Sequence, residues 1–214
     1  MTQADTIEDG RYWFTLATQG MLPENIFDTK KLNWNVDIHE RLRDEGRASD
    51  QFFVRSSVTY LATSKSSYSF GFDYLVNHPP GKSSLDEQRL WQQFSYKFDP
   101  LANVNFSSRT RLESRWREDG DETAFRLRQM IRASVPLPIK PSISAVIYDE
   151  LFVNLNETDW GSYRGIDQNR LFLGFNWAFN ANTALEMGYI NQYINTRTID
   201  RENHIVSTTL KLTF

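Results

Sequence analysis

The sequence predicts an all-β protein, a transmembrane antiparallel up-and-down β-barrel of ten or twelve strands with a polar, arginine-rich lumen. Most of the chain alternates apolar and polar residues with period two, as half-buried strands do. Strand after strand, the apolar face is large and nearly free of charge. The chain also finishes on a strand, residues 204–214, whose apolar face ends at Phe214, whereas free termini usually fray.

Composition bounds the fold class and excludes several functions. A chain of 214 residues fits one domain, so we expect residues 1–214 to form a single barrel, with residues 1–10 as a disordered segment. Cysteine is absent, which excludes disulfides and thiolate metal sites. Mean hydropathy is −0.54, and no apolar run approaches the ~18 residues of a spanning helix. A membrane barrel needs only every second residue apolar. The net charge of −3 gives no electrostatic case for nucleic acid.

The first residues of the chain do not resemble a signal peptide, because residues 1–5 lack a basic region followed by an apolar core. A soluble cytoplasmic protein begins in this way, and so does a mature exported protein whose leader was replaced by a start Met. Localisation therefore has to be predicted from the strands.

In the first half of the chain, the alternation predicts five strands, at residues 12–18, 32–43, 52–61, 68–75 and 87–98. The opposite faces carry mainly polar and charged side chains, with Trp91 among them in the last stretch. The apolar positions of the last four stretches are Leu32, Trp34, Val36, Ile38, Leu42, Phe52, Val54, Val58, Tyr60, Tyr68, Phe70, Phe72, Tyr74, Leu90, Phe94, Tyr96 and Phe98.

The second half predicts six further strands, at residues 104–117, 125–135, 143–154, 168–177, 185–192 and 204–214. The first two are joined by the turn at 118–121, and arginine recurs on their polar faces. The stretch 143–154 is less regular. With Glu150 and Phe152 facing inward, Asp149 is left on the apolar face.

The connections predict the orientation of the barrel. Segments 98–101, 135–138 and 179–182 read as tight periplasmic turns, whereas 77–86, 155–167 and 196–203 are longer and polar, as extracellular loops tend to be. The alternation gives eleven segments, but single-chain bacterial barrels have an even number of strands. We therefore expect ten strands from residue 32 onward, or twelve with a partner for residues 12–18.

A soluble barrel would alternate in the same way but with its apolar side chains inward. Three features favour the membrane: the apolar faces are nearly free of charge, the chain ends on Phe214, and aromatic residues cluster near segment ends as interfacial girdles do. The girdle candidates are Trp34, Tyr96, Phe98, Trp116 and Phe179. Outer-membrane barrels end on such a strand, so we expect the barrel-assembly machinery to read Leu210, Leu212 and Phe214 as an insertion signal.

Four motifs resemble a known family in content and order: EQRLWQQ at 87–93, YDELFVNLN at 148–156, QNRLFLGF at 168–175 and EMGYINQ at 186–192. The chain resembles number 2490 in the domain-of-unknown-function series, uncharacterised exported barrels of Gram-negative bacteria. The resemblance covers about residues 12–214 and implies an exported β-barrel. It implies no activity, so function has to come from the residues.

If the apolar face meets lipid, the lumen carries fourteen basic and six acidic side chains, a positive surplus of eight. Cations at the lipid midplane cost ~2–4 kcal/mol each, which is why they point inward. The basic set is Arg41, Arg43, Arg55, Arg89, Lys97, Arg109, Arg111, Arg115, Arg117, Arg126, Arg128, Arg132, Arg170 and Lys211. The acidic set is Asp37, Asp73, Glu87, Glu113, Glu150 and Glu186.

Two interpretations of this lumen remain open. Arginine and glutamate on neighbouring strands can interlock and fill a narrow barrel. Alternatively, arginine that lacks a carboxylate lines a pore that favours anions. For the second, we predict a selectivity patch of Arg109, Arg111, Arg115, Arg126, Arg128 and Arg132. We predict as its charge partners Glu87, Arg89, Glu113, Glu150, Arg170 and Glu186. Replacing Arg111 and Arg128 by Glu is then expected to weaken or reverse ion preference in a barrel that still folds.

The sequence gives little support for an enzyme, and we expect no cofactor and no metal site. Of three histidines only His39, near Asp37, faces the lumen, where a hydrogen-bonded structural role is the simpler interpretation. An outer-membrane lipid hydrolase is the weaker alternative, and an adhesive barrel acting through loop 156–167, with Trp160 and Tyr163, is the stronger. The predicted partners are membrane lipid, lipopolysaccharide, the assembly machinery and a small anionic solute. We expect a monomer in the bacterial outer membrane.

Overall fold

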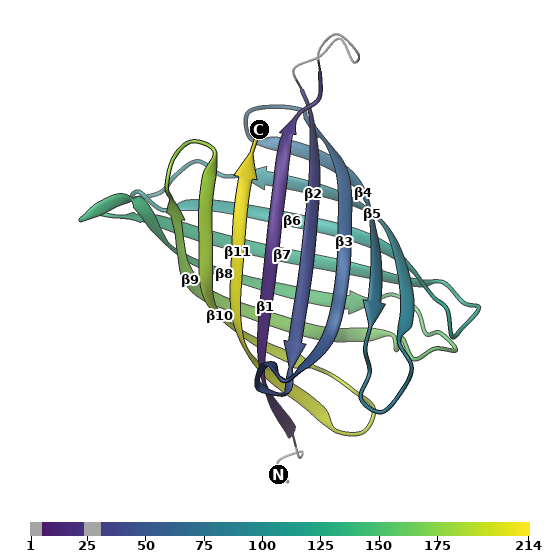
Figure 1. The fold of residues 1–214 in the computed structure, drawn as a ribbon. Helices are drawn as coiled ribbons and strands as arrows, with labels where there is room; N and C mark the ends of the chain where they lie inside the picture. The colour runs from purple at the N-terminus through teal and green to yellow at the C-terminus, as the bar shows by residue number, and fades with distance from the viewer. Residues whose placement is uncertain (1–5, 24–30) are drawn as a thin grey trace.

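The computed structural model describes residues 6–23 and 31–214, which form one closed β-barrel. This described part contains eleven strands and one short 3₁₀ helix, η1, at Asp44–Gly46. The strands are β1 Thr6–Met21, β2 Leu32–Arg43, β3 Ala48–Leu61, β4 Ser66–Asn77, β5 Leu85–Lys97, β6 Asn105–Arg117, β7 Ala124–Leu137, β8 Lys140–Asn154, β9 Gly165–Ala178, β10 Thr183–Ile194 and β11 Asp200–Thr213. In Figure 1, β1–β3, β10 and β11 form the near wall, and β6–β8 cross behind them.

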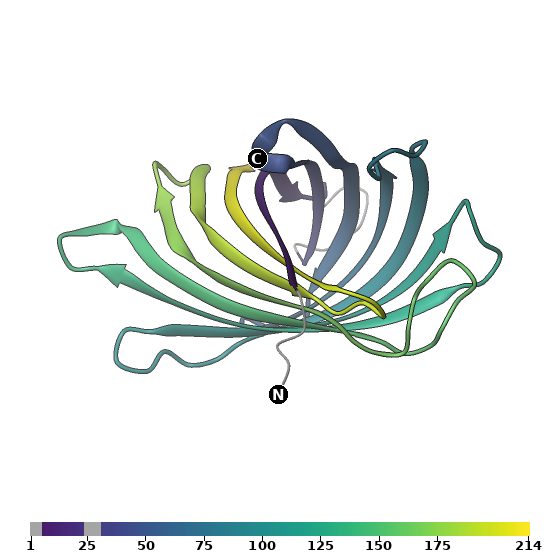
Figure 2. The same ribbon diagram turned by 90° about the horizontal axis from the view of Figure 1, so that it is seen from below.

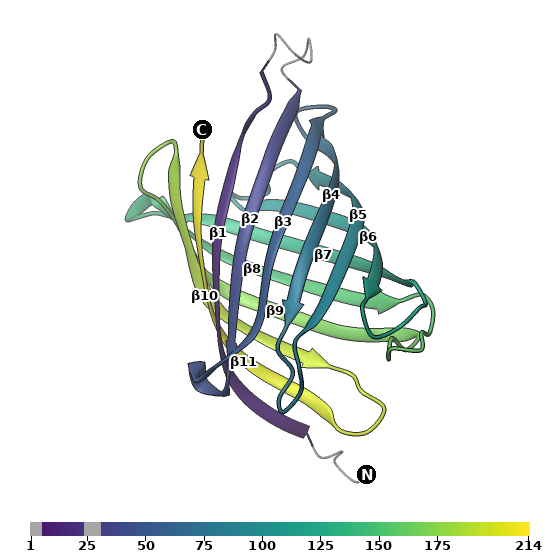
Figure 3. The ribbon, with the colours of Figure 1, turned by 45° about the vertical axis from the view of Figure 1, so that its right-hand side comes forward.

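Each strand pairs in antiparallel fashion with the next along the chain, and β1 closes the barrel by pairing in parallel with β11, from Thr6 opposite Asp200 to Gln19 opposite Thr213. The expectation of ten or twelve strands is therefore wrong, and the count of eleven segments is right. An even number is required only when the first and last strands run in opposite directions. Here they run side by side in the same direction (Figure 3).

Parallel closure places the N-terminal end of β1 and the C-terminal end of β11 at opposite ends of the barrel (Figure 1). The C-terminal end, here called the turn end, holds the connections 62–65, 98–104, 138–139 and 179–182. The loop end holds 44–47, 78–84, 118–123, 155–164 and 195–199, and Figure 2 views the barrel from this end. The two predicted sets of connections thus lie at opposite ends. The β7–β8 hairpin turns at 138–139 and not at 135–138, because both strands extend further than predicted.

The prediction of a disordered segment at residues 1–10 is wrong for its second half. Residues 6–10 belong to β1 and pair with β11, and residues 1–5 lie outside the described residues. A row of cross-strand neighbours that starts at Met21 and passes through every strand returns to β1 at Ile7, fourteen residues away. This offset is the stagger that tilts the strands and closes the sheet.

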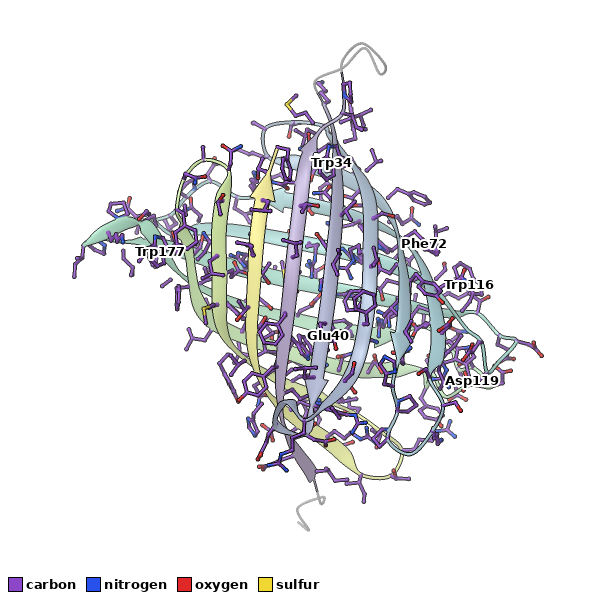
Figure 4. The ribbon with its side chains drawn as sticks, in the orientation of Figure 1. Trp34, Glu40, Phe72, Trp116, Asp119 and Trp177 are labelled. Carbon is purple, nitrogen blue, oxygen red and sulfur yellow. The ribbon has the colours of Figure 1, made fainter. Side chains whose placement is uncertain are left out.

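The outer face of the barrel is apolar and exposed to its surroundings. Phe70 is 59% exposed and Leu173 is 62% exposed, as expected for side chains that point away from the barrel. Aromatic side chains gather at the turn end, where Trp34 stacks on Phe214 and Trp177 contacts Phe179. In Figure 4, Trp34 and Trp177 lie toward this end, and Trp116 lies toward the other. In the described part of the chain, no helix is long and apolar enough to cross a bilayer.

One side of the interior is apolar. Ring stacking holds Phe172 in this cluster, because its ring lies parallel to that of Tyr148 with centroids 4.7 Å apart. Glycine makes room for that ring: a Cβ at Gly188 would lie 2.6 Å from Phe172 and 2.5 Å from the carbonyl oxygen of Leu173. The cluster draws on β1 and β8–β11 and consists of Trp13, Val146, Phe172, Ile190 and Ile205.

Candidate functional site

Glu113 on β6 is the centre of an ion-pair network inside the barrel. Its side chain is fully buried, and Arg126 donates to Oε2 through Nε at 2.9 Å and Nη2 at 2.7 Å. Arg128 donates to Oε1 through Nη1 at 2.6 Å. Because removing one member of a buried ion pair leaves an uncompensated charge, at a cost of about 3–5 kcal/mol, the three side chains depend on each other.

Glu150 on β8 extends the network across the next strand. Its Oε1 accepts hydrogen bonds from Nη2 of Arg128 at 2.8 Å and from Nη2 of Arg109 at 2.5 Å. Arg128 therefore bridges two buried carboxylates, Glu113 and Glu150. This arrangement neutralises much of the arginine-rich face of β6 and β7 with a carboxylate from β8.

Other carboxylates reach this face from β5 and β10. Glu87 on β5 accepts from Arg89 at 2.7 Å and from Arg115 at 2.6 Å. Nearer the turn end, Glu186 on β10 binds Arg132 at 2.5 Å and Lys211 at 2.9 Å. Of the six arginines in the predicted patch, five thus have a carboxylate within 3.0 Å.

Arg111, the sixth, is bound mainly by an amide and a ring. It donates to Gln93 Oε1 through Nε at 2.9 Å and Nη2 at 2.7 Å. Its guanidinium lies 3.7 Å from the ring centroid of Trp91, and the nearest carboxylate, Glu113, is 3.9 Å away. A desolvated cation over an indole gains about 2 kcal/mol, which partly replaces a salt bridge.

Arg41 on β2 and Arg170 on β9 have no carboxylate within 4.0 Å among the described residues. Arg41 donates to Gln51 Oε1 at 2.7 Å, and Arg170 donates to Gln168 Oε1 at 3.0 Å. Both guanidiniums lie over the ring of Trp13, at 4.0 and 4.8 Å from its centroid. Neither charge is therefore balanced by a salt bridge within the described residues.

Two cavities lie along the interior, and Arg41 and Arg170 line both of them. The outer cavity, at the loop end, has a volume of about 430 Å³ and is lined by eight arginines and three carboxylates. The inner cavity has a volume of about 230 Å³ and is lined by seven arginines and one carboxylate. Five side chains line both cavities and so mark their boundary: Trp13, Arg41, Arg89, Arg126 and Arg170.

Trp160, in the β8–β9 loop, lines the outer cavity. The side chain is only 7% exposed, and its Nε1 donates to the carbonyl oxygen of Glu122 at 2.7 Å. Nη2 of Arg117 donates to the Trp160 carbonyl oxygen at 2.5 Å. Asp159 also links the connections 155–164 and 118–123, because its side chain accepts a hydrogen bond from the backbone N–H of Asp121 at 2.9 Å. The prediction of Trp160 as an exposed contact residue is thus wrong, whereas Tyr163 is 40% exposed and stacks with a cation.

Arg117 is held in this position by Asp119, in the turn that follows β6. Nη2 of Arg117 donates to Oδ2 of Asp119 at 2.8 Å. This hydrogen bond lowers the pKa of the Asp119 carboxyl below its ordinary value. Asp119 therefore stays ionised, and Arg117 stays oriented, at neutral and mildly acidic pH. Figure 4 places Asp119 beside Trp116 at this end of the barrel.

The structure distributes the predicted patch between the two cavities. Arg109, Arg126 and Arg128 line the inner cavity, and Arg115 and Arg126 line the outer one. Arg111 and Arg132 line neither. Sequence reasoning missed Trp13 and the availability of Arg41, because alternation gives the face of a residue but not its partner on another strand.

His39 lies in the wall of the inner cavity. Its ring stacks on Phe53 with centroids 3.9 Å apart, its Nδ1 is 2.9 Å from the Thr15 hydroxyl, and its Nε2 is 3.8 Å from Asp37. These contacts hold the imidazole in place. Within the described ranges, no group of three or more His, Asp or Glu side chains could hold a metal ion.

Comparisons with known proteins place the chain beside sequences of undescribed activity. The sequence model of a family described as "Protein of unknown function (DUF2490)" matches residues 10–203. An uncharacterised protein of Methylorubrum extorquens strain AM1 is 31% identical over 209 residues, which make up 97% of this chain and 89% of that protein. No solved structure matches the chain significantly.

Proposed function

Since the chain belongs to the DUF2490 family, for which no activity is described, we propose that it is an outer-membrane β-barrel that passes small anionic solutes through its interior. The four motifs predicted this family, and the barrel agrees with the exported β-barrel that the resemblance implies. Bacterial outer membranes are the usual location of such barrels. β11, with Leu210, Leu212 and Phe214, would be the strand that the assembly machinery reads.

The distribution of side chains supports the membrane location. Large apolar residues are exposed on the outer face, while the arginine and glutamate network is buried. A soluble barrel places these sets the other way round. With lipid outside, the apolar face replaces water contacts by contacts with acyl chains, and each buried cation avoids the ~2–4 kcal/mol cost of facing lipid.

The observation that carries anion passage is the arginine-rich lining of the two cavities. Among the lining side chains, arginines outnumber carboxylates by eight to three in the outer cavity and by seven to one in the inner cavity, with four arginines shared by both. Asp73, Glu113 and Glu150 pair with several of these arginines from outside the cavity lining, whereas Arg41 and Arg170 have no carboxylate within 4.0 Å among the described residues. Basic side chains that line a pore favour anions, and Arg41 and Arg170 line both cavities. The volumes suit small solutes only, and the buried Trp160 side chain lines the outer cavity at the loop end, so we infer that it gates passage there.

A closed structural barrel that acts through its loops is the second candidate. The observation that favours it is the interlocked interior, in which Glu87, Glu113 and Glu150 each bind at least two arginines. In this case the charges stabilise the barrel and no solute enters. The connections at the loop end of the barrel would then carry the function.

Electrical recording distinguishes the two candidates. The chain is refolded in detergent, inserted into a planar bilayer and recorded across a salt gradient. Discrete conductance steps whose reversal potential indicates anion preference would support the channel. A folded, heat-modifiable barrel without conductance, including in a Trp160→Ala variant, would exclude it and favour the closed barrel.

A further inference from the structure

The outer face of β5–β9 carries a diagonal row of polar side chains, here called the polar stripe: Gln92, Thr110, Gln129, Asp149 and Asn169. Thr110 lies directly opposite Gln129. The other steps are diagonal, since Asp149 faces Ile131, two residues from Gln129. Diagonal neighbours on a sheet are ~7–8 Å apart, within reach of long side chains.

The polar stripe lies inside the apolar outer face and not at its rim. Asp149 is exposed, and its neighbours on the adjacent strands are Ile131, 50% exposed, and Leu171, 45% exposed. Gln92 lies in the same way between Phe70 and Leu112. These polar atoms therefore face lipid if the barrel is embedded as proposed.

Hydrogen bonds within the stripe satisfy only part of it. The Thr110 hydroxyl donates to Gln129 Oε1 at 2.6 Å, and Asn169 Nδ2 donates to Asp149 Oδ1 at 2.8 Å. The second oxygen of Asp149 and the side-chain amide of Gln92 have no hydrogen bond within the described part of the chain. The Gln129 amide reaches only a backbone carbonyl, at 3.4 Å. In lipid, each such group costs several kcal/mol.

An apolar groove adjoins the stripe on its turn-end side. Small side chains, Ala133 on β7 and Ala145 on β8, are among its lining residues, and its volume is about 200 Å³. Ile147 and Leu173 also line it. Small residues on a lipid-facing surface let two backbones approach closely, and polar side chains beside them then bond across the contact.

We propose that this surface binds a second copy of the chain across a two-fold axis, with Asp149 of each copy accepting hydrogen bonds from Gln92 or Gln129 of the other. The stripe runs from amide donors at Gln92 to a carboxylate at Asp149, so two stripes in opposite directions complement each other. An acyl chain offers neither donor nor acceptor. This inference rests on the proposed membrane location and replaces the monomer expected from the sequence.

Glu40 provides a matched control. It is also a carboxylate on the outer face, between Phe14 and Phe52, but it accepts from the Ser49 hydroxyl at 2.8 Å and lies on β2, outside the polar stripe. Figure 4 shows Glu40 on the near wall, whereas β6–β8 cross behind.

The test is sedimentation equilibrium of the refolded chain in density-matched detergent micelles. We expect a dimer whose dissociation constant rises about tenfold or more in the double variant Asp149→Leu with Gln129→Leu, equivalent to about 1.4 kcal/mol. Glu40→Leu should leave the constant unchanged. A folded wild-type barrel that stays monomeric at every concentration, or a dimer that the double variant does not weaken, would overturn the inference.

Cross-linking in native-like membranes gives a second readout. The chain has no cysteine, so Leu151→Cys, between Gln129 and Asn169 in the register, should form a disulfide dimer on oxidation, while Val206→Cys, at an exposed outer-face position of β11, should not. Equal cross-linking at both positions would contradict the assigned face. Folding to the barrel in buffer without detergent or lipid would refute the membrane location itself, whereas a monomer that folds only in micelles refutes the dimer alone.

Discussion

Arg128 donates to Glu113 at 2.6 Å although the two residues are not direct neighbours: Arg128 faces Arg111 in the register, and Glu113 faces Arg126. The diagonal contact lets one carboxylate bind two arginines and leaves the other side of Arg128 for Glu150. Charge on these strands is therefore balanced by groups of three and four side chains and not by isolated pairs.

The first prediction concerns this group. Glu113→Gln should lower the free energy of unfolding by about 3–5 kcal/mol, because Arg126 and Arg128 would lose a buried counter-charge. Urea unfolding in micelles, followed by loss of heat-modifiable mobility, measures the change. The control is Glu157→Gln, which removes an exposed ion pair with Arg197 and should cost less than about 1 kcal/mol. Equal effects of the two variants would refute the network.

The charge-reversal variant suggested by the sequence has a different expected outcome in this structure. Arg128→Glu would place a third carboxylate beside Glu113 and Glu150, so Arg111→Glu with Arg128→Glu should fail to fold. Recovery of a heat-modifiable barrel from this double variant would contradict that expectation.

The second prediction places ion preference at Arg41 and Arg170. Replacing both by Gln removes two charges from the boundary of the cavities and breaks no salt bridge within 4.0 Å among the described residues. Anion preference should therefore weaken, with the reversal potential moving toward zero, while the barrel folds normally. Arg47→Gln, an exposed cation in the β2–β3 connection, is the control and should not shift the potential. An unchanged potential in the double variant would exclude these two residues from selection.

The third prediction concerns the outer cavity at the loop end of the barrel. Trp160→Ala should raise the open probability several-fold, because it removes the ring that lines the outer cavity and is proposed to gate it, together with the hydrogen bond of that ring to the Glu122 carbonyl oxygen. Tyr163→Ala changes an aromatic residue of the same loop that is 40% exposed and does not line that cavity. Single-channel recording compares the two variants. Similar open probabilities would show that Trp160 is not the closing element.

The fourth prediction is a pH dependence of this closure. The hydrogen bond with Arg117 lowers the pKa of the Asp119 carboxyl in the folded protein. The contribution of Asp119 to closure is therefore complete above the pKa of an unfolded aspartate, about 4. It is lost as the pH falls through the lower pKa of the folded state. Open probability should stay constant from pH 7 to 5 and rise only below about pH 4. Asp119→Asn should show the raised open probability at pH 7. A rise centred between pH 5 and 7 would point to another group.

Local pattern predicted the strands and their faces, but not the closure of the barrel. Period-two alternation identifies each strand from its own residues, and it placed Asp149 outward. Parallel pairing of β1 with β11 depends on the stagger summed over all strands, which no single strand encodes. The same limit explains why the contact of Glu150 with Arg109, and the position of Trp160 over the outer cavity, could not be predicted.

The last prediction tests the close contact between a glycine and a ring inside the barrel. Gly188→Ala would put a methyl group 2.5 Å from the Leu173 carbonyl oxygen and 2.6 Å from the Phe172 ring. A backbone atom cannot yield as a side chain can, so we expect destabilisation of about 1–3 kcal/mol, the usual range for overpacking. Adding Phe172→Leu should relieve only the ring contact, so the double variant should remain less stable than Phe172→Leu alone. Urea unfolding of the unchanged chain, the two single variants and the double variant measures the cost of the ring contact and the cost of the carbonyl contact. A double variant as stable as Phe172→Leu would show that the carbonyl contact is not limiting and that β9 and β10 can separate there at little cost.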